Sequence, residues 1–271
     1  LPDGAGLSSS AALEVLTTYF LLELSGQEMS RPQIARFCQK VENEFVKVSC
    51  GIMDQFSVAM GKENSAILLN CTSLEYQYIP LDLENYSLVI MNTNKKRELA
   101  SSKYNERKKE CDNALALLNE FGSFPNLCAA PIELAEKLKD PILKKRALHV
   151  ISENQRVLEA VDALKNKDIA KFGALLTSSH LSLQHYYEVS GLELDTIVLE
   201  ALKIKGCIGA RMTGAGFGGC ALALVEKNEV EIFKQKLSAI YYHKTHLIPS
   251  FYESKISDGV KEILAKSEIL S

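Results

Sequence analysis

Hydrophobic residues near the start of the chain repeat at the spacing of a helix. From Leu7 to Leu24 the apolar positions return every three or four residues, and Ser25-Gly26 ends the run. We predict a buried helix here, directly after the glycine-rich turn of residues 1–6. A second helix is predicted to start at Ser30, with Pro32 in its first turn. Its expected apolar face consists of Ile34, Phe37, Val41 and Phe45.

After residue 50 the predicted elements become shorter, and strands appear among them. Residues 52–60 predict a third, shorter helix that carries Asp54, after a break at Cys50-Gly51. Residues 65–70 and 76–81 read as two strands around a turn at Thr72-Ser73, and residues 86–91 form another apolar strand. A domain boundary is predicted near residue 84.

The second half of the chain is predicted to be mainly helical, with two strands after the last predicted helix. A charged helix is expected at 101–118, helices at about 131–180 with Pro131 and Pro141 as breaks, and a further helix at 193–203. Strands at 207–212 and 221–225 flank a glycine-rich loop at 213–219. The pattern is that of an α+β protein without internal repeats.

Composition narrows the class of protein. The 271 residues are 46% apolar, which is enough for one large or two modest domains. Lys plus Arg number 31 against 34 for Asp plus Glu, with no long run of one sign, so the sequence favours a small-molecule or protein partner over nucleic acid. No segment predicts a membrane helix or a signal peptide. Seven cysteines without a C-x-x-C pair indicate reduced thiols in the cytoplasm and no structural zinc.

The strongest motif is the segment Gly4-Ala-Gly-Leu-Ser-Ser-Ser10 before the first predicted helix. Glycines let a backbone approach a phosphate, and the N-terminus of a helix offers unpaired N–H groups to an anion. The alternative is a serine-capped helix after an ordinary turn. Because no Lys follows the glycines, the segment is not a Walker A loop. The chain begins without Met and opens on this turn with no strand before it, so we expect it to be truncated.

The second glycine-rich segment formally matches a dinucleotide fingerprint, Gly214-x-Gly216-x-x-Gly219. A fingerprint of that kind must open a helix, whereas residues 221–225 read as a strand. The oxidoreductase interpretation is therefore rejected. A hairpin with glycines at positive φ remains as the structural interpretation.

Three further residues have both a functional and an ordinary interpretation. Asp54 follows a glycine break and could lie in a partly dry pocket, or it is simply an acid at a helix start. Glu42 is either functional or a solvated helix residue. Tyr104 is either a ligand-binding residue or an amphipathic side chain that rests its ring on the core. The five histidines show no metal-ligand spacing, and none is assigned to catalysis.

Residues 1–12 resemble the phosphate-binding motif of the GHMP kinases, in the triple-serine form typical of the galactokinase family. Further segments carry the same resemblance beyond residue 225, and it continues weakly to Ser257-Asp258-Gly259. These segments are ENEF at 42–45 with CGIMDQF at 50–56, NTNK at 92–95 with SKY at 102–104, YEVS at 187–190 with ELD at 193–195, and RMTGAGFGGC at 211–220.

The resemblance implies the two-domain GHMP-kinase fold. Residues 1–84 would be the remainder of an N-terminal domain similar to ribosomal protein S5 domain 2, and residues 85–271 a ferredoxin-like C-terminal domain. It also implies transfer of the ATP γ-phosphoryl group to the C1 hydroxyl of α-D-galactose, with Mg²⁺ as the metal. The implied partners are galactose and ATP, with no nucleic acid or membrane, in a cytoplasmic monomer or weak dimer.

The resemblance also assigns roles to individual residues. Asp54 would be the catalytic carboxylate, and Ser10 and Glu42 would hold magnesium. Gly51, Asp54 and Tyr104 would lie against the sugar. The ATP phosphates would bind to Gly4, Ala5, Gly6, Leu7, Ser8, Ser9 and Ser10. The supporting glycine loop would consist of Gly214, Gly216, Gly218 and Gly219.

The sequence departs from the family pattern in a few places. Lys47 and Ser49 stand where Gly and Pro are more usual, and Gly191-Leu192 replaces Cys-Pro. The upstream family motif that supplies a catalytic Arg and several sugar ligands has no match here. We therefore expect residues 1–271 alone to be inactive and the first helix to expose an apolar face. A kinase for N-acetylgalactosamine or arabinose, or a non-catalytic sugar sensor, remains as an alternative.

Overall fold

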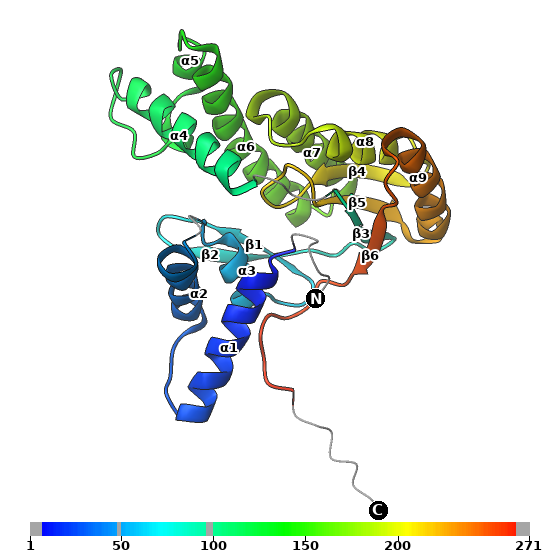
Figure 1. The fold of residues 1–271 in the computed structure, drawn as a ribbon, viewed down its shortest axis with the longest axis horizontal. Coiled ribbons are helices and arrows are strands. Elements are labelled where there is room, and N and C mark those ends of the chain that lie inside the picture. Colours follow the sequence, from blue (N-terminus) through cyan, green and yellow to red (C-terminus); the bar gives the residue numbers. More distant parts are fainter. Residues whose placement is uncertain (1–6, 48–49, 96–99, 264–271) are drawn as a thin grey trace, which may run out of the picture. The chain divides into compact units, whose positions relative to one another are not determined.

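A computed structural model describes residues 7–47, 50–95 and 100–263 of the chain. The chain divides into two compact units, whose elements are labelled in Figure 1. The small unit contains Ser8–Leu81 and the residues from Ile256 onward, and the large unit contains Asp82–Lys255. The predicted division into residues 1–84 and 85–271 stays a prediction.

The small unit contains three helices and a two-stranded sheet in its described part. Helix α1 spans Ser9–Ser25, α2 spans Arg31–Val41 and continues as a π-helical turn, η1, at Glu42–Val46, and α3 spans Met53–Met60. Strands β1 (Ser65–Leu69) and β2 (Tyr76–Pro80) pair antiparallel. Each of these helices and strands was predicted, except the π-helical turn η1. Gly26 ends α1 in the left-handed conformation, and Ser30 with Gln33 forms a capping box at α2.

The core of the small unit differs from the predicted helix faces. Helix α1 buries only Ala11 and Val15, so the prediction of a buried helix is wrong, whereas the expectation that this helix exposes an apolar face is confirmed. Helix α2 buries Ile34, Ala35 and Cys38 against α3, while Phe37 and Phe45 are exposed. Both corrections have one cause: among the described residues, nothing packs on the outer side of these helices. The exposed apolar residues of α1 are Leu13, Leu16, Phe20, Leu21 and Leu24.

The segment near the end of the chain adds to the small unit. The backbone N–H of Gly259 donates to the carbonyl of Gly61 at 2.8 Å, and that of Val260 donates to the carbonyl of Val58 at 3.0 Å. The Asp258 carboxylate accepts from the N–H of Glu63 at 2.9 Å. These bonds hold the chain against the end of α3.

The large unit is built on a four-stranded antiparallel sheet of order β4-β5-β3-β6. Strand β3 spans Tyr86–Asn92, β4 spans Cys207–Met212, β5 spans Cys220–Glu226 and β6 spans Ser250–Ser254. The strands predicted at 86–91, 207–212 and 221–225 are confirmed. Strand β6 and helix α9 (Val230–Thr245) were not predicted.

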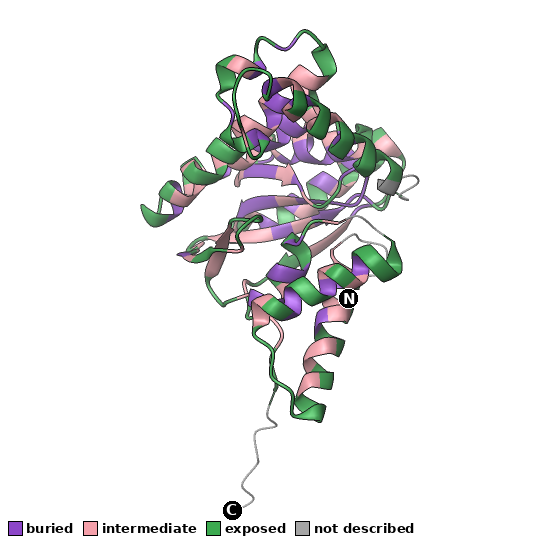
Figure 2. Cartoon of the chain, turned by 90° about the vertical axis from the view of Figure 1, so that its left-hand side faces the viewer, coloured by how far each residue is buried: buried purple, intermediate pink, exposed green. Residues whose placement is uncertain are grey.

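Helices make up the rest of the large unit. They are α4 (Ala100–Leu118), α5 (Ile132–Ala135), α6 (Pro141–Lys165), α7 (Ile169–Ser182) and α8 (Leu192–Ala201), with short turns η2 (Leu127–Ala129), η3 (Leu183–Tyr187) and η4 (Lys227–Glu229). The predicted helical regions are confirmed. Buried residues run along the sheet and the helices beside it, as Figure 2 shows.

None of the helices in the described ranges combines the length and the apolar character needed to cross a bilayer.

Candidate functional site

The N-terminus of α1 carries the serines of the first motif. Ser8 precedes the helix in the left-handed conformation, with φ 56°, and its side chain makes no capping hydrogen bond. Its carbonyl accepts from the N–H of Ala12 at 3.0 Å, while Ser10 is exposed. The first N–H groups of a helix have no partner within it and carry partial positive charge. This end of α1 can therefore receive an anion. Gly4, Ala5 and Gly6 lie outside the described residues, and Leu7 is half-buried.

Glu42 lies where α2 changes into the π-helical turn η1. Its side chain is only 7% exposed, so the interpretation as a solvated helix residue is wrong. Its Oε2 atom is buried and has no hydrogen-bond partner among the described residues. A buried polar atom without a partner costs free energy unless something outside the protein satisfies it. π-Helical turns are frequent at functional sites, which fits a ligand here.

Two residues that the sequence analysis missed lie beside Glu42. Glu14 shares a hydrogen bond with Glu42 and another with Gln55, which is only 2% exposed. Burial, as the largest cause, together with the hydrogen bond and the charge of Glu42 raises the pKa of Glu14 to about 7. The Oε2 of Glu14 and the Oε1 of Gln55 are also buried without a partner. Glu14 stands one helical turn after Ser10, and this spacing was the available signal.

Asp54 is exposed in the first turn of α3. The expectation that it lies in a partly dry pocket is therefore wrong for the described residues, because no described element covers the start of α3. The loop before it is held by side chains: Asn43 Oδ1 accepts from the N–H of Cys50 at 2.9 Å, and Gln39 Nε2 donates to the carbonyl of Cys50 at 3.2 Å. Gly51 is exposed.

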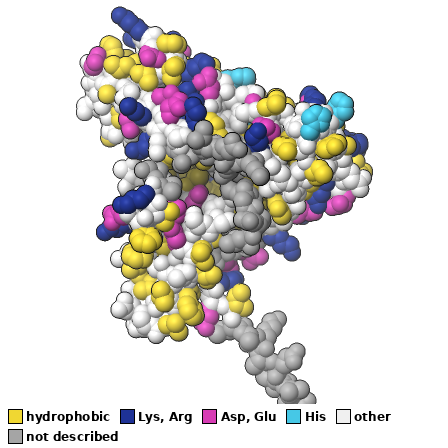
Figure 3. Space-filling view, viewed as in Figure 1, with side chains coloured by type: hydrophobic (Ala, Val, Ile, Leu, Met, Phe, Trp, Pro, Cys, Tyr) yellow, Lys and Arg dark blue, Asp and Glu magenta, His cyan; other side chains and the backbone are white. Residues whose placement is uncertain are grey.

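The small unit contains the described part of the predicted phosphate-binding segment together with Glu42 and Asp54. Hydrophobic side chains gather over this part of the molecule in Figure 3, where α1 leaves its outer face uncovered by described residues. Within the described ranges, no group of three or more His, Cys, Asp or Glu side chains could hold a metal ion. A cation would therefore need the Glu42 carboxyl together with hydroxyl or phosphate oxygens.

The predicted sugar-binding tyrosine belongs to the large unit. Tyr104 lies in the first turns of α4, and 38% of its surface is exposed. It contributes to the electrostatic environment of Tyr187, which lies at the end of η3. Burial is the main cause that raises the pKa of Tyr187, and Cys111 and Tyr104 raise it further.

The glycine loop between β4 and β5 is confirmed as a hairpin connection with glycines at positive φ. Gly214, Gly216, Gly218 and Gly219 have φ between 75° and 114°. Gly216 is required by its surroundings, because a Cβ there would lie 2.1 Å from the carbonyl oxygen of Val189. The carbonyl of Gly219 accepts from both the N–H and the hydroxyl of Thr93, at 2.9 and 2.8 Å.

Two histidines of the large unit are buried, and burial favours the uncharged form of each ring. His149 Nδ1 pairs with the Ser182 hydroxyl at 2.8 Å, and His180 Nδ1 accepts from the N–H of Met212 at 3.3 Å. Burial lowers the pKa of each to about 4. Both histidines therefore bond to groups of the large unit itself.

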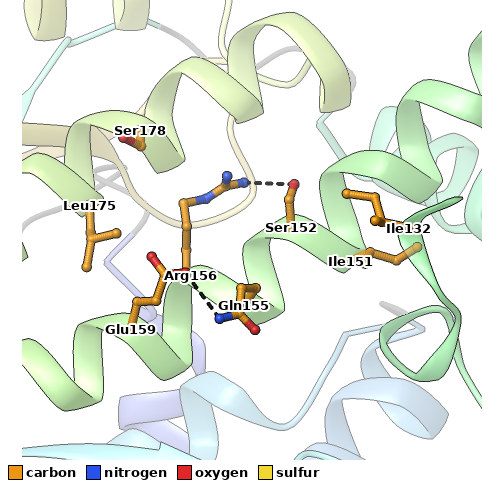
Figure 4. A pocket seen from close by; sticks show the side chains of 8 residues that line it. All are labelled: Ile132, Ile151, Ser152, Gln155, Arg156, Glu159, Leu175 and Ser178. Carbon is orange, nitrogen blue, oxygen red and sulfur yellow. Dashed lines mark hydrogen bonds between the residues drawn. The ribbon is translucent and has the colours of Figure 1, made fainter. Parts of the chain in front are cut away.

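A pocket of about 480 Å³ lies between α6 and α7 (Figure 4). Its apolar wall includes Ile151 and Leu175, and its polar side chains bind one another. Arg156 donates to Ser152 Oγ at 3.3 Å, and Gln155 donates to a Glu159 oxygen at 3.1 Å. None of the predicted site residues lines this pocket, and no polar group in it points to a particular ligand.

Comparison with known proteins gives a consistent result. A family model described as the GHMP kinases N-terminal domain matches residues 1–62, and the GHMP kinases C-terminal model matches residues 160–243. The chain is 50% identical to a galactokinase of Clostridium tetani over 97% of this chain and 68% of that protein. It is 49% identical to a galactokinase of Clostridium acetobutylicum over 97% of this chain and 69% of that protein.

Solved structures agree with these relatives. The chain is similar to the Lactococcus lactis galactokinase complexed with galactose, with a TM-score of 0.93 and 41% identity over 97% of this chain and 69% of that chain. A mevalonate kinase of L. major is similar in fold, with a TM-score of 0.63 and 16% identity over 94% of this chain and 67% of that chain.

Proposed function

The chain belongs to the galactokinase family of the GHMP kinases, and we propose that Asp54, Glu42 and the N-terminus of α1 carry its reaction. That reaction is transfer of the γ-phosphoryl group of ATP to the C1 hydroxyl of galactose. The observation that carries this proposal is the 50% identity to a galactokinase over 97% of the chain. The remaining argument concerns which residues do the chemistry.

The N-terminus of α1 binds the phosphates of ATP. Its open N–H groups and dipole favour the negative charge that develops on the β and γ oxygens during transfer. Ser8, Ser9 and Ser10 add hydroxyl donors at the same end of the helix. Phosphoryl transfer places little covalent demand on a protein, so positioning and charge stabilisation supply most of the catalysis.

Glu42 holds the magnesium ion that accompanies ATP, together with Ser10. The support is the buried Oε2 atom of Glu42, which no described residue satisfies. A carboxylate and a hydroxyl are the oxygen ligands that magnesium uses in kinase sites, along with the phosphates of the substrate. When bound, the ion neutralises charge on the transferring phosphoryl group.

Asp54 acts on the sugar. Its carboxylate orients the C1 hydroxyl and accepts the hydroxyl proton as the new oxygen–phosphorus bond forms, while ADP leaves with the electrons of the broken bond. Its exposed position in the first turn of α3 leaves the carboxylate accessible to a substrate. Tyr104 binds galactose through its hydroxyl, and the backbone of Gly51 lies near the sugar. The glycine loop at 214–219 supports the site.

The test of the reaction is a substrate panel on the intact protein. ADP release with ATP and magnesium is measured with galactose, N-acetylgalactosamine and arabinose in turn. We expect galactose to give the highest kcat/KM. A higher value for either of the other sugars would move the protein to a different GHMP sugar kinase, and sugar binding without ADP release would indicate a sensor.

A further inference from the structure

Two arginines of the large unit bind the backbone at the end of η3. Arg107, from α4, donates from Nε to the carbonyl of Tyr187 at 2.8 Å and from Nη2 to the carbonyl of Glu188 at 3.3 Å. Arg146, from α6, donates to the carbonyl of Tyr186. The last carbonyls of a helix have no partner within it and carry partial negative charge, so guanidinium groups suit this position.

Carboxylates fix both arginines in place. Glu110 Oε2 accepts from Arg146 at 2.6 Å and from Arg107 at 3.0 Å, and Glu188 Oε2 accepts from Arg146 at 2.8 Å. Arg146 is only 2% exposed, and Arg107 is also buried. Buried charges with several hydrogen bonds hold one geometry, because any other arrangement would leave a charge without a partner. The end of η3 is therefore a fixed point of the large unit.

The glycine loop contacts Val189, the residue that follows Glu188. The carbonyl of Val189 accepts from the N–H of Phe217 at 2.8 Å. Gly216 approaches the same carbonyl so closely that no larger residue fits there. A displacement of the backbone at residues 187–189 would therefore move the glycine loop with it.

Tyr104 approaches the same fixed point from α4. It stands one turn before Arg107 on that helix, so the two side chains lie on the same face. Tyr104 also interacts electrostatically with Tyr187, whose ring stacks on His149 with a centroid distance of 4.5 Å. The bonds from Arg107 to the carbonyls of Tyr187 and Glu188 join α4 to the backbone that supports the glycine loop.

We propose that Arg107 is a positioning residue that holds Tyr104 and the glycine loop in one fixed geometry. It contacts neither sugar nor nucleotide in this role and acts through the backbone of Tyr187 and Glu188. The proposal rests on the proposed function in one respect, the binding of galactose by Tyr104. Its structural part, the link from Arg107 to Phe217, does not depend on that role.

The structural part is tested by hydrogen exchange at the Phe217 amide, measured by NMR. In Arg107→Lys a single ammonium group cannot reach both carbonyls, although the charge beside Glu110 is kept. We expect the Phe217 amide to exchange at least about 10-fold faster, because the bond to Val189 opens more often. Lys108→Gln is the matched control, since Lys108 is exposed on the same helix and pairs only loosely with Asp112 at 3.9 Å.

Unchanged Phe217 exchange in folded Arg107→Lys would overturn the proposal. Folding is checked by the thermal melt of each variant, and the lysine variant is preferred over Arg107→Gln because it keeps the positive charge beside Glu110.

The functional part is tested by galactose titration of the intact protein. Arg107→Lys should weaken galactose binding about 2- to 10-fold, the range of one misplaced hydrogen bond, and should have no such effect when combined with Tyr104→Phe. An equal loss in both backgrounds would contradict the coupling to Tyr104. If Tyr104→Phe alone leaves affinity unchanged, the sugar role of Tyr104 fails, and the Phe217 measurement still decides the role of Arg107.

Discussion

The two units treat buried polar groups in opposite ways. In the large unit, Arg146 is almost fully buried and is bonded to Glu110, Glu188 and a backbone carbonyl. In the small unit, Glu42 and Gln55 are also buried, yet each keeps an oxygen without a partner among the described residues. Satisfied groups of the first kind stabilise a fold, whereas unsatisfied groups of the second kind cost stability until a ligand arrives. We infer from this contrast that the small unit carries the ligand-binding carboxylates and that the large unit supports the fold.

One pair in the large unit looks like an exception. His180 Nε2 and Asp195 Oδ1 are also buried without a hydrogen-bond partner. These two atoms, however, lie 3.5 Å apart, so each has the other as a polar neighbour. The unpartnered oxygens of Glu14, Glu42 and Gln55 are all acceptors unless one carboxyl carries a proton, and they cannot satisfy one another fully.

The largest expected effect lies in the small unit. Asp54→Asn in the intact protein should lower kcat by at least about 100-fold, because an amide cannot accept the proton of the sugar hydroxyl. ATP affinity should change little. Turnover and nucleotide binding are measured separately, by ADP release and by calorimetry. Turnover close to that of the wild type would remove Asp54 from the reaction.

The two units should also respond to pH with opposite signs. The folded-state pKa of Glu14, about 7, lies above its ordinary value of 4.5, so its contribution to stability is full below pH 4.5 and is lost as the pH rises through 7. The pKa values of His149 and His180, about 4, lie below 6.5, so their contribution is full above pH 6.5 and is lost as the pH falls toward 4.

Glu14→Gln isolates the first of these effects. Urea unfolding without metal should show that the wild type loses about 1 to 2 kcal/mol between pH 5 and pH 8 at this site, after allowance for partial solvent screening. The variant should not show this loss, because its amide does not titrate. Glu23→Gln, an exposed change on the same helix, should behave as the wild type does. Identical pH profiles for Glu14→Gln and the wild type would contradict the raised pKa.

The smallest effect is expected in the large unit. Tyr104→Phe should weaken galactose binding by about 0.5 to 1.5 kcal/mol, the value of one hydrogen bond, and should leave the fold intact. Galactose titration of the variant and the wild type measures the difference. Unchanged affinity would make Tyr104 an amphipathic surface residue, and sugar recognition would then not involve α4.

Sequence patterns predicted the helices and strands better than they predicted which residues pack against each of them. Helices α1 and α2 were predicted correctly, but periodicity placed Leu16 and Phe37 on buried faces, because it identifies an apolar face without saying whether anything covers it. The exposed apolar face of α1 was expected only from the family resemblance. The glycine loop was predicted because strands on both sides excluded a helix. Glu14 was missed because its only signal in the sequence is its spacing of one helical turn from Ser10, and its contact with Glu42 arises only on folding.

The contrast between the units is tested most directly by exchanging one carboxyl for an amide in each. Glu42→Gln should leave the free energy of unfolding unchanged or higher and raise the magnesium concentration needed for ADP release by about 10-fold or more. Glu188→Gln should lower the free energy of unfolding by about 1 kcal/mol or less, because the Glu188 side chain is 41% exposed, and should leave the magnesium requirement as it is. A destabilised Glu42→Gln with a normal magnesium requirement would contradict the assignment of Glu42 as a ligand-binding group.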